Sequence, residues 1–452
     1  MAKYFGTNGI RARLDVLTPE FISRMSFAFG IWSKRGKILL ARDTRISGPM
    51  LKHSAISGLI SAGCEVIDLG IAPAPTVEFM VKRLGASGAI TITASHNPPE
   101  WNALKFVDGD SVAVSWERGE EIEKIFEDTN APRADWNKLG KVTIYQSSID
   151  EHISAISDYV DIPSIKKRNP LLMLDCANGT ASFFAPKLFR KLGCRILTLN
   201  AQPDGFFPGH NSEPTKENLS DLISCVKSTG AVMGIAWDGD CDRVIFIDEK
   251  GGYIIGDKSY AISVDIALRE TKLKNPKVVT TVATTDMIKD ITERHGGEVI
   301  YTKVGGPYLA EQLMANKAVS GGEEAGGVIW PDIHPGKDGF ITAAKILEAV
   351  CMEKPLSQFI DDLPTYYNSK TKIYCSADQK ITAIEKMKGV PPEEGVEALK
   401  VDGVRFNATD GWCILRPSGT ENLVRIFAEA KTPEKARALM EHYEQKVRAF
   451  IK

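Results

Sequence analysis

The sequence lacks several features that mark particular classes of protein. No run of about 18 apolar residues occurs, so a transmembrane helix is not expected. Lys and Arg number 56 and Asp and Glu number 58 among 452 residues, so the formal net charge is only −2. That balance argues against a polybasic nucleic-acid binder. The sequence therefore predicts a globular protein with neither a membrane nor a nucleic-acid partner.

Cysteine pairs and the common nucleotide-binding motifs are also missing. The eight cysteines form no C-x-x-C pair, which argues against zinc-finger and thioredoxin-like proteins and favours reduced thiols in a cytoplasmic protein. No G-x-x-x-x-G-K-[ST], G-x-G-x-x-G or G-x-S-x-G motif is present. The standard nucleotide cradles and an α/β-hydrolase site are therefore not expected.

Three segments repeat one pattern with a period of roughly a hundred residues. They begin near Lys37, Pro170 and Pro276. In each, a short apolar strand, a helix and a second strand lead to a third strand that ends in a polar loop. Short apolar runs that alternate with helical patterns indicate βαβ units with parallel or mixed sheets.

The loops that end the three repeats are the most unusual stretches of the sequence: TASHNP, DGDCDR and GGEEAGG. Ligands of α/β sheets bind at the carboxyl ends of the strands. Because the three loops occupy equivalent positions, we expect the three domains to face one shared cleft.

The pattern changes after about Pro364, where a Pro- and Glu-rich loop precedes strands around RPSGTEN and a last helix. Thr432 and Pro433 suit the start of that helix. The predicted fold class is α/β: three duplicated α/β domains with mixed sheets and a smaller C-terminal α+β domain. The predicted boundaries are 1–150, 151–252, 253–365 and 366–452.

Asp238, Asp240 and Asp242 alternate directly after the apolar strand GIAW. Three carboxylates this close repel one another unless a cation neutralises them, and oxygen ligands without His favour Mg²⁺ or a relative. Cys241 is a soft donor and is expected to point away. An EF-hand is excluded because Arg243 stands where its loop needs Gly. A plain charged turn, and a phosphatase with Asp238 as phosphate acceptor, remain alternatives.

Ser95 follows the strand AITIT and precedes His96 and two prolines, which exclude a helix and predict an exposed loop. A serine nucleophile needs a base or a charged environment. His96 and Lys105 are the nearest candidates for proton transfer. An Asx/Ser turn without catalytic role explains the residue types equally well.

RPSGTEN offers an arginine fork, hydroxyls and a flexible glycine, which together suit a phosphate. Its candidates are Arg416, Ser418, Gly419, Thr420 and, on the next strand, Arg425. A hairpin turn with an ordinary surface arginine is the alternative.

In GGEEAGG, Glu323 and Glu324 can accept hydrogen bonds from sugar hydroxyls or a sugar ammonium, and the glycines let the backbone approach a ligand closely. A glycine-rich loop without function fits as well. Arg11 and the ARDTR segment, which contains Arg45, add cations that suit either a site or structural ion pairs.

Taken in order, FGTNGIR, RDTR, TASHNP, DGDCDR, GGEEAGG and RPSGTEN resemble the α-D-phosphohexomutase family across essentially the whole chain. The resemblance implies four domains around a central cleft. It also implies an isomerase that moves a phosphoryl group between the 6- and 1-positions of a hexose or hexosamine phosphate, through a phosphoserine and a sugar bisphosphate.

The resemblance implies a role for each motif. Ser95 is the expected phosphoserine, and Asp238, Asp240 and Asp242 bind Mg²⁺ together with its phosphate. Arg243 lies close to the phosphoserine, and Lys105 is a proton-transfer candidate; His96 and Arg11 complete the catalytic candidates. The implied substrate-binding set is Glu323, Arg416, Ser418, Gly419, Thr420 and Arg425.

The opening FGTNGIR is similar to phosphoglucosamine mutases, so conversion of glucosamine 6-phosphate to glucosamine 1-phosphate is the first expectation. Bacterial phosphoglucosamine mutases, however, carry the sugar loop G-E-Q-S-G-H, where this chain has Ala325 and Gly327 in place of Ser and His. A phosphomannomutase/phosphoglucomutase is therefore the alternative. A non-catalytic sugar-phosphate sensor is disfavoured, because a sensor has no need of the nucleophile.

Overall fold

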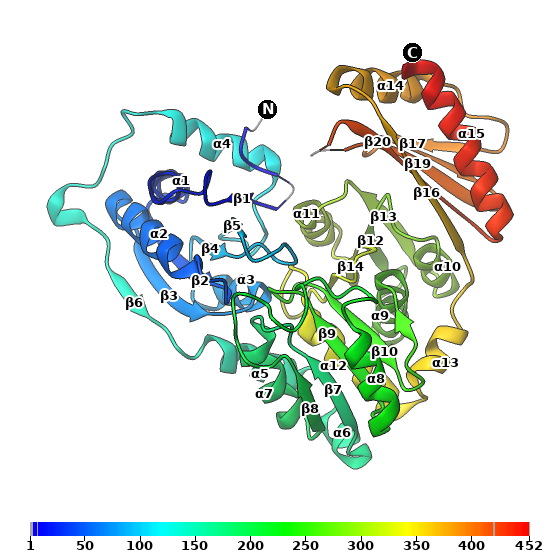
Figure 1. Cartoon of the computed structure of the whole chain (residues 1–452), viewed down its shortest axis with the longest axis horizontal. Helices are drawn as coiled ribbons and strands as arrows, with labels where there is room; N and C mark the ends of the chain where they lie inside the picture. Colours follow the sequence, from blue (N-terminus) through cyan, green and yellow to red (C-terminus); the bar gives the residue numbers. More distant parts are fainter. Residues whose placement is uncertain (1–2, 7, 419–420, 452) are drawn as a thin grey trace.

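The computed structural model describes residues 3–6, 8–418 and 421–451. Within them the chain forms four sheets, each with its own helices. Figure 1 shows these four units in an arc, from the N-terminal unit (blue) through the green and yellow units to the C-terminal unit (orange and red). No helix of the described residues has the length and apolar character needed to cross a membrane.

The first unit is built on a six-stranded sheet with the order β1-β5-β4-β2-β3-β6. Its elements are β1 (Ile10–Arg13), α1 (Pro19–Trp32), β2 (Lys37–Arg42), α2 (Gly48–Ala62), β3 (Glu65–Ile71), α3 (Ala74–Arg83), β4 (Gly88–Ile92), β5 (Trp101–Asp108), α4 (Trp116–Glu127), a 3₁₀ turn (Trp136–Lys138) and β6 (Val142–Ile144).

The second unit has the strand order β11-β10-β9-β7-β8 and the third has β13-β12-β14-β15. The second comprises α5 (Ser148–Asp158), α6 (Ile162–Arg168), β7 (Leu171–Asp175), α7 (Ala181–Lys191), β8 (Arg195–Leu199), α8 (Ser220–Thr229), β9 (Met233–Trp237), β10 (Val244–Asp248) and β11 (Tyr253–Ile254). The third comprises α9 (Gly256–Glu270), β12 (Lys277–Thr281), α10 (Met287–Arg294), β13 (Glu298–Thr302), α11 (Gly306–Asn316), β14 (Ser320–Gly322), β15 (Val328–Ile329), α12 (Gly339–Met352) and α13 (Leu356–Asp361).

The three units share one strand arrangement, which confirms the predicted repeat. In each, the first strand of the repeat (β2, β7 or β12) lies between two parallel neighbours. One of these neighbours (β4, β9 or β14) is followed by a turn and a strand that pairs with it in antiparallel orientation (β5, β10 or β15). TASHNP, DGDCDR and GGEEAGG lie in these three turns, so the fold places them at equivalent edges.

The fourth unit is an antiparallel sheet with the order β16-β20-β19-β18-β17, covered by two helices. Its elements are β16 (Tyr367–Tyr374), α14 (Ala377–Gly389), β17 (Glu397–Leu399), β18 (Val404–Ala408), β19 (Gly411–Pro417), β20 (Leu423–Ala430) and α15 (Pro433–Ile451). As predicted, α15 begins at Pro433, with the Thr432 hydroxyl accepting from Lys435 N at 3.3 Å. The α+β expectation for this part is confirmed.

The hydrophobic cores bind the units unequally. One continuous core runs through the second and third units, with Phe184 of α7 stacked on Phe340 of α12 at 3.9 Å between ring centroids. The first and fourth units have separate cores. The second and third units therefore form a common base, and the first and fourth rise from its two ends. All eight cysteines are free.

Arg405 of β18 attaches the fourth unit to the third. Its side chain is almost fully buried, and Nη1 donates to Val282 O at 3.0 Å and to Thr284 O at 3.3 Å. The guanidinium also lies 4.1 Å from the ring centroid of Trp412. Because this cation joins backbone carbonyls of one unit to an aromatic ring of the other, it holds the two sheets in a defined relation.

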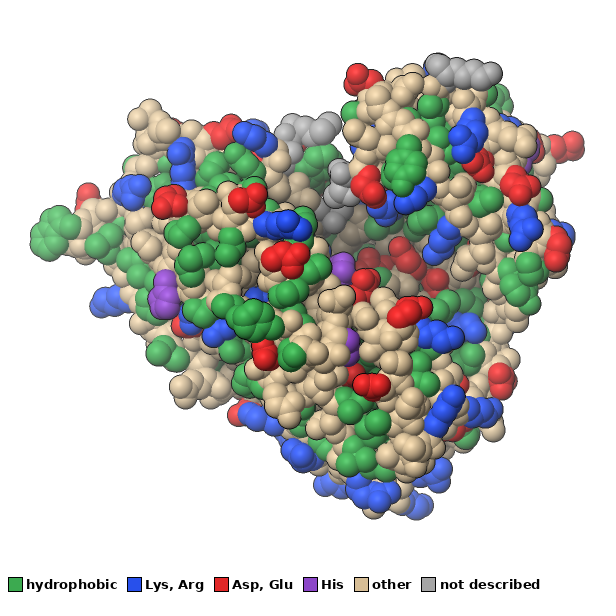
Figure 2. Space-filling view, viewed as in Figure 1, with side chains coloured by type: hydrophobic (Ala, Val, Ile, Leu, Met, Phe, Trp, Pro, Cys, Tyr) green, Lys and Arg blue, Asp and Glu red, His purple; other side chains and the backbone are tan. Residues whose placement is uncertain are grey.

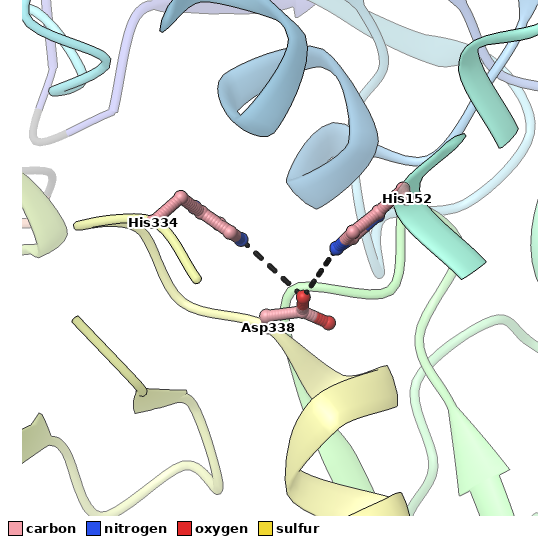
Figure 3. Close-up of side chains that lie close together, drawn as sticks. All are labelled: His152, His334 and Asp338. Atoms are coloured by element: carbon pink, nitrogen blue, oxygen red, sulfur yellow. Dashed lines mark hydrogen bonds and ion pairs between the residues drawn. The ribbon is translucent and has the colours of Figure 1, made fainter. Parts of the chain in front are cut away.

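A buried cluster joins the first three units (Figure 3). Asp338 Oδ2 lies 3.0 Å from His152 Nε2 on α5 and 3.3 Å from His334 Nε2. Asp338 Oδ1 accepts from the first N–H groups of α12. On the far side, His152 Nδ1 lies 3.1 Å from Thr76 Oγ1 of α3, and Glu78 Oε2 of α3 is 3.8 Å from His334 Nδ1. The cluster fixes α3 of the first unit on the common base.

Glu78 gives this junction a pH dependence. Burial raises the pKa of Glu78 to about 7, with His334 opposing the rise. The folded protein therefore holds a proton that the unfolded chain releases near pH 4.5, so Glu78 costs stability as pH rises from about 4.5 to 7. We expect Glu78→Gln to match the wild-type melting temperature at pH 5 and to exceed it by about 2–4 °C at pH 8.

The exposed Glu127 on α4 supplies the control, and Glu127→Gln should leave the difference between the two pH values unchanged. Equal melting temperatures of wild type and Glu78→Gln at pH 8 would contradict a raised pKa at this carboxyl.

Candidate functional site

The loop between β4 and β5 carries Ser95 and is held from within by Arg45. The Arg45 side chain is fully buried. Its two Nη atoms donate to the carbonyl oxygens of Ser95, Asn97, Pro98 and Trp101 at 2.5–3.1 Å. One planar cation thus fixes four carbonyls, so the loop is shaped before a ligand binds. The sequence left open whether Arg45 binds a ligand or has a structural role, and these contacts are those of a structural residue.

Ser95 itself is buried, with 3% of its surface exposed, so the prediction of an exposed serine was wrong. The cause is the turn between β9 and β10, which packs directly on the serine loop. A Cβ at Gly239 of that turn would lie only 2.5 Å from Ser95 O. The close approach of two backbones therefore requires glycine at this position.

The Ser95 hydroxyl lies between a carboxylate and a guanidinium. Ser95 Oγ donates to Asp238 Oδ2 at 2.7 Å and accepts from Arg243 Nη2 at 3.3 Å. Arg243 Nη2 also donates to His96 Nδ1. Burial and the Arg243 cation lower the pKa of His96 to about 3. At neutral pH the imidazole is therefore uncharged and serves as an acceptor.

The three aspartates converge, with one oxygen of each within 4.8 Å of the others. All three are buried, and Asp240 Oδ1 and Asp242 Oδ1 have no hydrogen-bond partner among the described residues. Buried carboxylate oxygens without partners are costly, and they suit a hard divalent cation. Cys241 Sγ points elsewhere, 3.3 Å from Thr180 Oγ1, as predicted.

Burial and neighbouring charges set the protonation of the triad. Burial raises the pKa of Asp238 to about 7; Arg243 opposes this effect, and Asp242 adds to it. Burial acts in the same direction on Asp242, but Lys337, Lys105 and Arg243 outweigh it and hold the pKa of that carboxyl well below its usual range. The triad is therefore stabilised by cations that come from all three α/β units.

Lys105 of β5 is one of the cations that the first unit contributes. Its Nζ donates to Asp240 Oδ2 at 2.5 Å and lies 3.7 Å from Asp242 Oδ2. Burial lowers the pKa of Lys105, but Asp240 and Asp242 outweigh it and the net shift is upward. In this structure Lys105 is therefore an ammonium.

Arg11 reaches the same place from β1, which pairs with β5. Its Nη1 donates to Asn97 Oδ1 at 2.5 Å. Burial lowers the pKa of Arg11, with Asp240 opposing. The predicted catalytic candidates Ser95, His96, Lys105, Arg11 and Arg243 thus lie together with the three aspartates.

The turn between β14 and β15 carries a buried glutamate, Glu323, and a half-buried one, Glu324. Glu323 Oε1 accepts from Lys337 Nζ at 2.5 Å, and Glu324 Oε2 accepts from Thr281 Oγ1 at 3.4 Å. Burial and then Glu323 raise the pKa of Glu324. Gly322 makes room for a side chain of the protein and not for a ligand, because a Cβ at this position would lie 2.6 Å from the Tyr260 ring.

In the fourth unit, Arg416 lies near the end of β19 and Ser418 begins the turn to β20. Arg416 Nε donates to Asp402 Oδ2 at 3.0 Å, and Nη2 forms an ion pair with the same oxygen at 2.8 Å. This oxygen also accepts from Val304 N at 3.1 Å. Arg425 pairs with Glu421 at 3.0 Å. The two other predicted residues of this turn, Gly419 and Thr420, lie outside the described residues.

Figure 2 shows a hollow between the first and fourth units, with acidic side chains gathered inside it. Within the parts of the chain that the structure describes, Arg416 bonds to Asp402 and not to the Ser95 cluster. The predicted residues thus form two groups, one around Ser95 and the three aspartates and one in the fourth unit.

Models of one family match nearly the whole chain, in the order of the four units. The phosphoglucomutase/phosphomannomutase domain models cover residues 2–133 (α/β/α domain I), 150–252 (domain II), 255–367 (domain III) and 371–445 (C-terminal domain). The chain belongs to the phosphoglucomutase/phosphomannomutase family. Mutases are isomerases, so the protein is an enzyme of that class.

Curated relatives of this mutase span its full length. A phosphoglucomutase/phosphomannomutase of Thermococcus kodakarensis is 43% identical over 98% of this chain and 97% of its own. A probable phosphoglucosamine mutase of Methanopyrus kandleri is 38% identical over 100% and 99%. Among solved structures, a phosphoglucomutase/phosphomannomutase family protein of Burkholderia thailandensis superposes with a TM-score of 0.88 at 26% identity, covering 100% of this chain and 98% of that one.

Two residues that pair with predicted site residues escaped prediction from the sequence. Lys337 and Asp402 lie in connecting segments that carry no motif. For Lys337 a signal was present: a lysine directly before Asp338, which caps α12, is held at the edge of the sheet.

Proposed function

We propose that the protein is a phosphohexomutase that moves a phosphoryl group between the 6- and 1-positions of a hexose phosphate, with Ser95 as the carrier. The observation that carries this proposal is the position of Ser95 Oγ, 2.7 Å from Asp238 Oδ2 and 3.3 Å from Arg243 Nη2. A serine hydroxyl beside a cation-binding triad and a guanidinium is suited to hold a phosphoryl group and release it again.

The triad fits Mg²⁺, because its donors are all carboxylate oxygens and two of them lack partners among the described side chains. Asp238, Asp240 and Asp242, with an oxygen of the Ser95 phosphate, would hold the ion. Bound there, Mg²⁺ supplies neutralisation of the charge on the transferring phosphoryl group.

The surrounding side chains carry out the remaining tasks. Arg243 holds the phosphoryl oxygens next to Ser95, and Lys105 Nζ holds a proton beside the reacting hydroxyl. His96 stays neutral and orients Arg243. Arg11 orients Asn97 of the serine loop and adds a cation to the wall of the cleft. Burial of Ser95 keeps water from the phosphoserine.

The fourth unit anchors the phosphate that does not react. The residues that would bind it are Arg416, Ser418, Gly419, Thr420 and Arg425. The sugar bisphosphate is both intermediate and activator, and it reverses its orientation between the two half-reactions. An anchor that accepts either end of the bisphosphate must bind phosphate without reading the carbon that bears it. We also propose domain boundaries near residues 150, 252 and 365.

For the sugar we propose glucose and mannose phosphates first. We call the turn between β14 and β15, which carries Glu323, the sugar loop. Because Lys337 already compensates the charge of Glu323, this loop offers little attraction to the 2-ammonium group of glucosamine. The more similar of the two curated relatives is the phosphoglucomutase/phosphomannomutase. Glucosamine 6-phosphate is the second candidate, favoured by the FGTNGIR opening, and it stays a prediction.

The proposed carrier is tested with purified protein, Mg²⁺, a sugar bisphosphate activator and the 6-phosphates of glucose, mannose and glucosamine. We expect interconversion with the 1-phosphates and a phosphorylated Ser95 peptide by mass spectrometry. Ser95→Ala should lose on the order of 10³-fold or more in turnover. Ser212→Ala, which removes a hydroxyl that donates to Ser95 O at 3.2 Å, is the matched control and should keep most activity.

Three results together would contradict the mutase proposal and indicate a phosphatase with Asp238 as nucleophile. They are release of inorganic phosphate from the sugar phosphate, trapping of the phosphoryl group on Asp238, and full activity of the Ser95→Ala variant.

The metal assignment predicts a linked loss of binding and activity. Asp240→Asn removes a charged ligand, so Mg²⁺ affinity measured by calorimetry should fall at least about tenfold and turnover should fall with it. Asp175→Asn, at the end of the neighbouring strand β7, should leave Mg²⁺ affinity unchanged. Undiminished turnover of the wild type in excess chelator would exclude the assignment.

The phosphate anchor predicts an equal effect on both isomers. Arg416→Lys keeps the charge but loses the planar fork, so the 1-phosphate and the 6-phosphate should both bind more weakly, by about 1–3 kcal/mol. Calorimetry with each isomer measures the loss. Loading of Ser95 by excess bisphosphate should change little. An effect on one isomer alone would require a different pivot for the reorientation.

A further inference from the structure

Lys337 connects the sugar loop to the metal loop, although these loops come from different sheets. It lies between β15 and α12, and its side chain is 11% exposed. The Nζ donates to Glu323 Oε1 at 2.5 Å and lies 3.3 Å from Asp242 Oδ2. One ammonium therefore compensates a carboxylate on each of two loops that the proposed function assigns to the sugar and to the metal.

The space for this side chain exists because Gly327 has none. A Cβ at Gly327 would lie 2.4 Å from Lys337 Cδ, and a Cβ at Gly306 would lie 3.6 Å from Lys337 Cε. The φ of Gly327 lies outside the left-handed region, so its backbone would accept another residue. Glycine is needed at this position because the aliphatic part of the Lys337 side chain occupies the space of a Cβ, and not because of the backbone conformation.

The charge at the sugar loop depends on this one lysine. Glu323 is 9% exposed, and its neighbour Glu324 is a half-buried carboxyl whose pKa is raised by desolvation and by Glu323. Among the described side chains, the ion pair formed by Glu323 is the one with Lys337. Without the lysine, the loop would present an uncompensated carboxylate in a poorly hydrated place, where charges act strongly on a nearby ligand.

We propose that Lys337 determines sugar specificity: by compensating Glu323, it makes the sugar loop neutral toward the ligand and so favours hexose phosphates that are uncharged at carbon 2 over hexosamine phosphates. The proposal rests on the proposed mutase function. Lys337 acts through Glu323 and is a positioning residue. Removal of its charge should raise the preference for a sugar that carries an ammonium group.

Lys337→Met is the sharpest test, because the methionine stem still fills the space beside Gly327 while the charge is gone. We expect the ratio of kcat/KM for glucosamine 6-phosphate to that for glucose 6-phosphate to rise about five- to tenfold. A ratio is needed because the loss of the contact to Asp242 lowers kcat for both sugars alike. Lys337→Arg retains the charge and should keep the wild-type ratio.

A double variant separates charge from packing. Lys337→Met/Glu323→Gln removes both members of the pair, so the sugar loop is neutral again and the ratio should return to within about twofold of wild type. Lys303→Gln, at an exposed lysine of the same unit, is the control for a general loss of positive charge. A merely structural role for Lys337 would lower turnover of both sugars and leave the ratio unchanged.

Binding supplies a readout that does not need turnover. On a Ser95→Ala background without metal, calorimetry with glucosamine 6-phosphate and glucose 6-phosphate should show the same change in ratio. If the wild type turns over no hexose phosphate, the mutase proposal fails, and the binding ratio still decides the role of Lys337. An unchanged ratio in Lys337→Met, or no reversal in the double variant, would overturn the inference; should Lys337→Met not fold, Lys337→Gln takes its place.

Discussion

Compensation of buried negative charge is the constraint on which the site depends. Asp238, Asp240 and Asp242 lie on one turn, all shielded from water, and they cannot remain ionised together without cations close by. No single unit supplies enough of them. Arg243 comes from the turn itself, Lys105 from the first unit and Lys337 from the third, so assembly of the three units and stabilisation of the triad are one event.

Duplication of the α/β unit explains why the loops meet. Each copy ends its third strand in a turn at the same edge of its sheet, so three copies around a common base bring three turns together. The copies have diverged in chemistry while keeping geometry: one turn carries a hydroxyl, one carries carboxylates, and one carries a carboxylate compensated by a lysine. The fourth unit has another topology, an antiparallel sheet, and carries Arg416 and Ser418.

The sequence was informative where a motif or a period carries physical meaning. The strands of the repeat, the antiparallel pair around RPSGTEN and the start of α15 followed from apolar runs and from capping residues such as Thr432. Burial of Ser95 was not predictable, because it depends on a turn about 140 residues away whose approach requires Gly239. Lys337 was missed although it directly precedes the capping residue Asp338, because its partner Asp242 lies in another unit.

The pairing of Arg416 with Asp402 has a consequence for the phosphate anchor that we propose. The guanidinium has already left bulk water and already has an anion, so an arriving phosphate exchanges one partner for another and gains only the difference between them. Binding by exchange of partners has a small net free energy, so the phosphate dissociates easily. Weak binding suits a ligand that must dissociate from the loop, rotate and bind again by its other phosphate, because tight binding would stop the reaction at the intermediate.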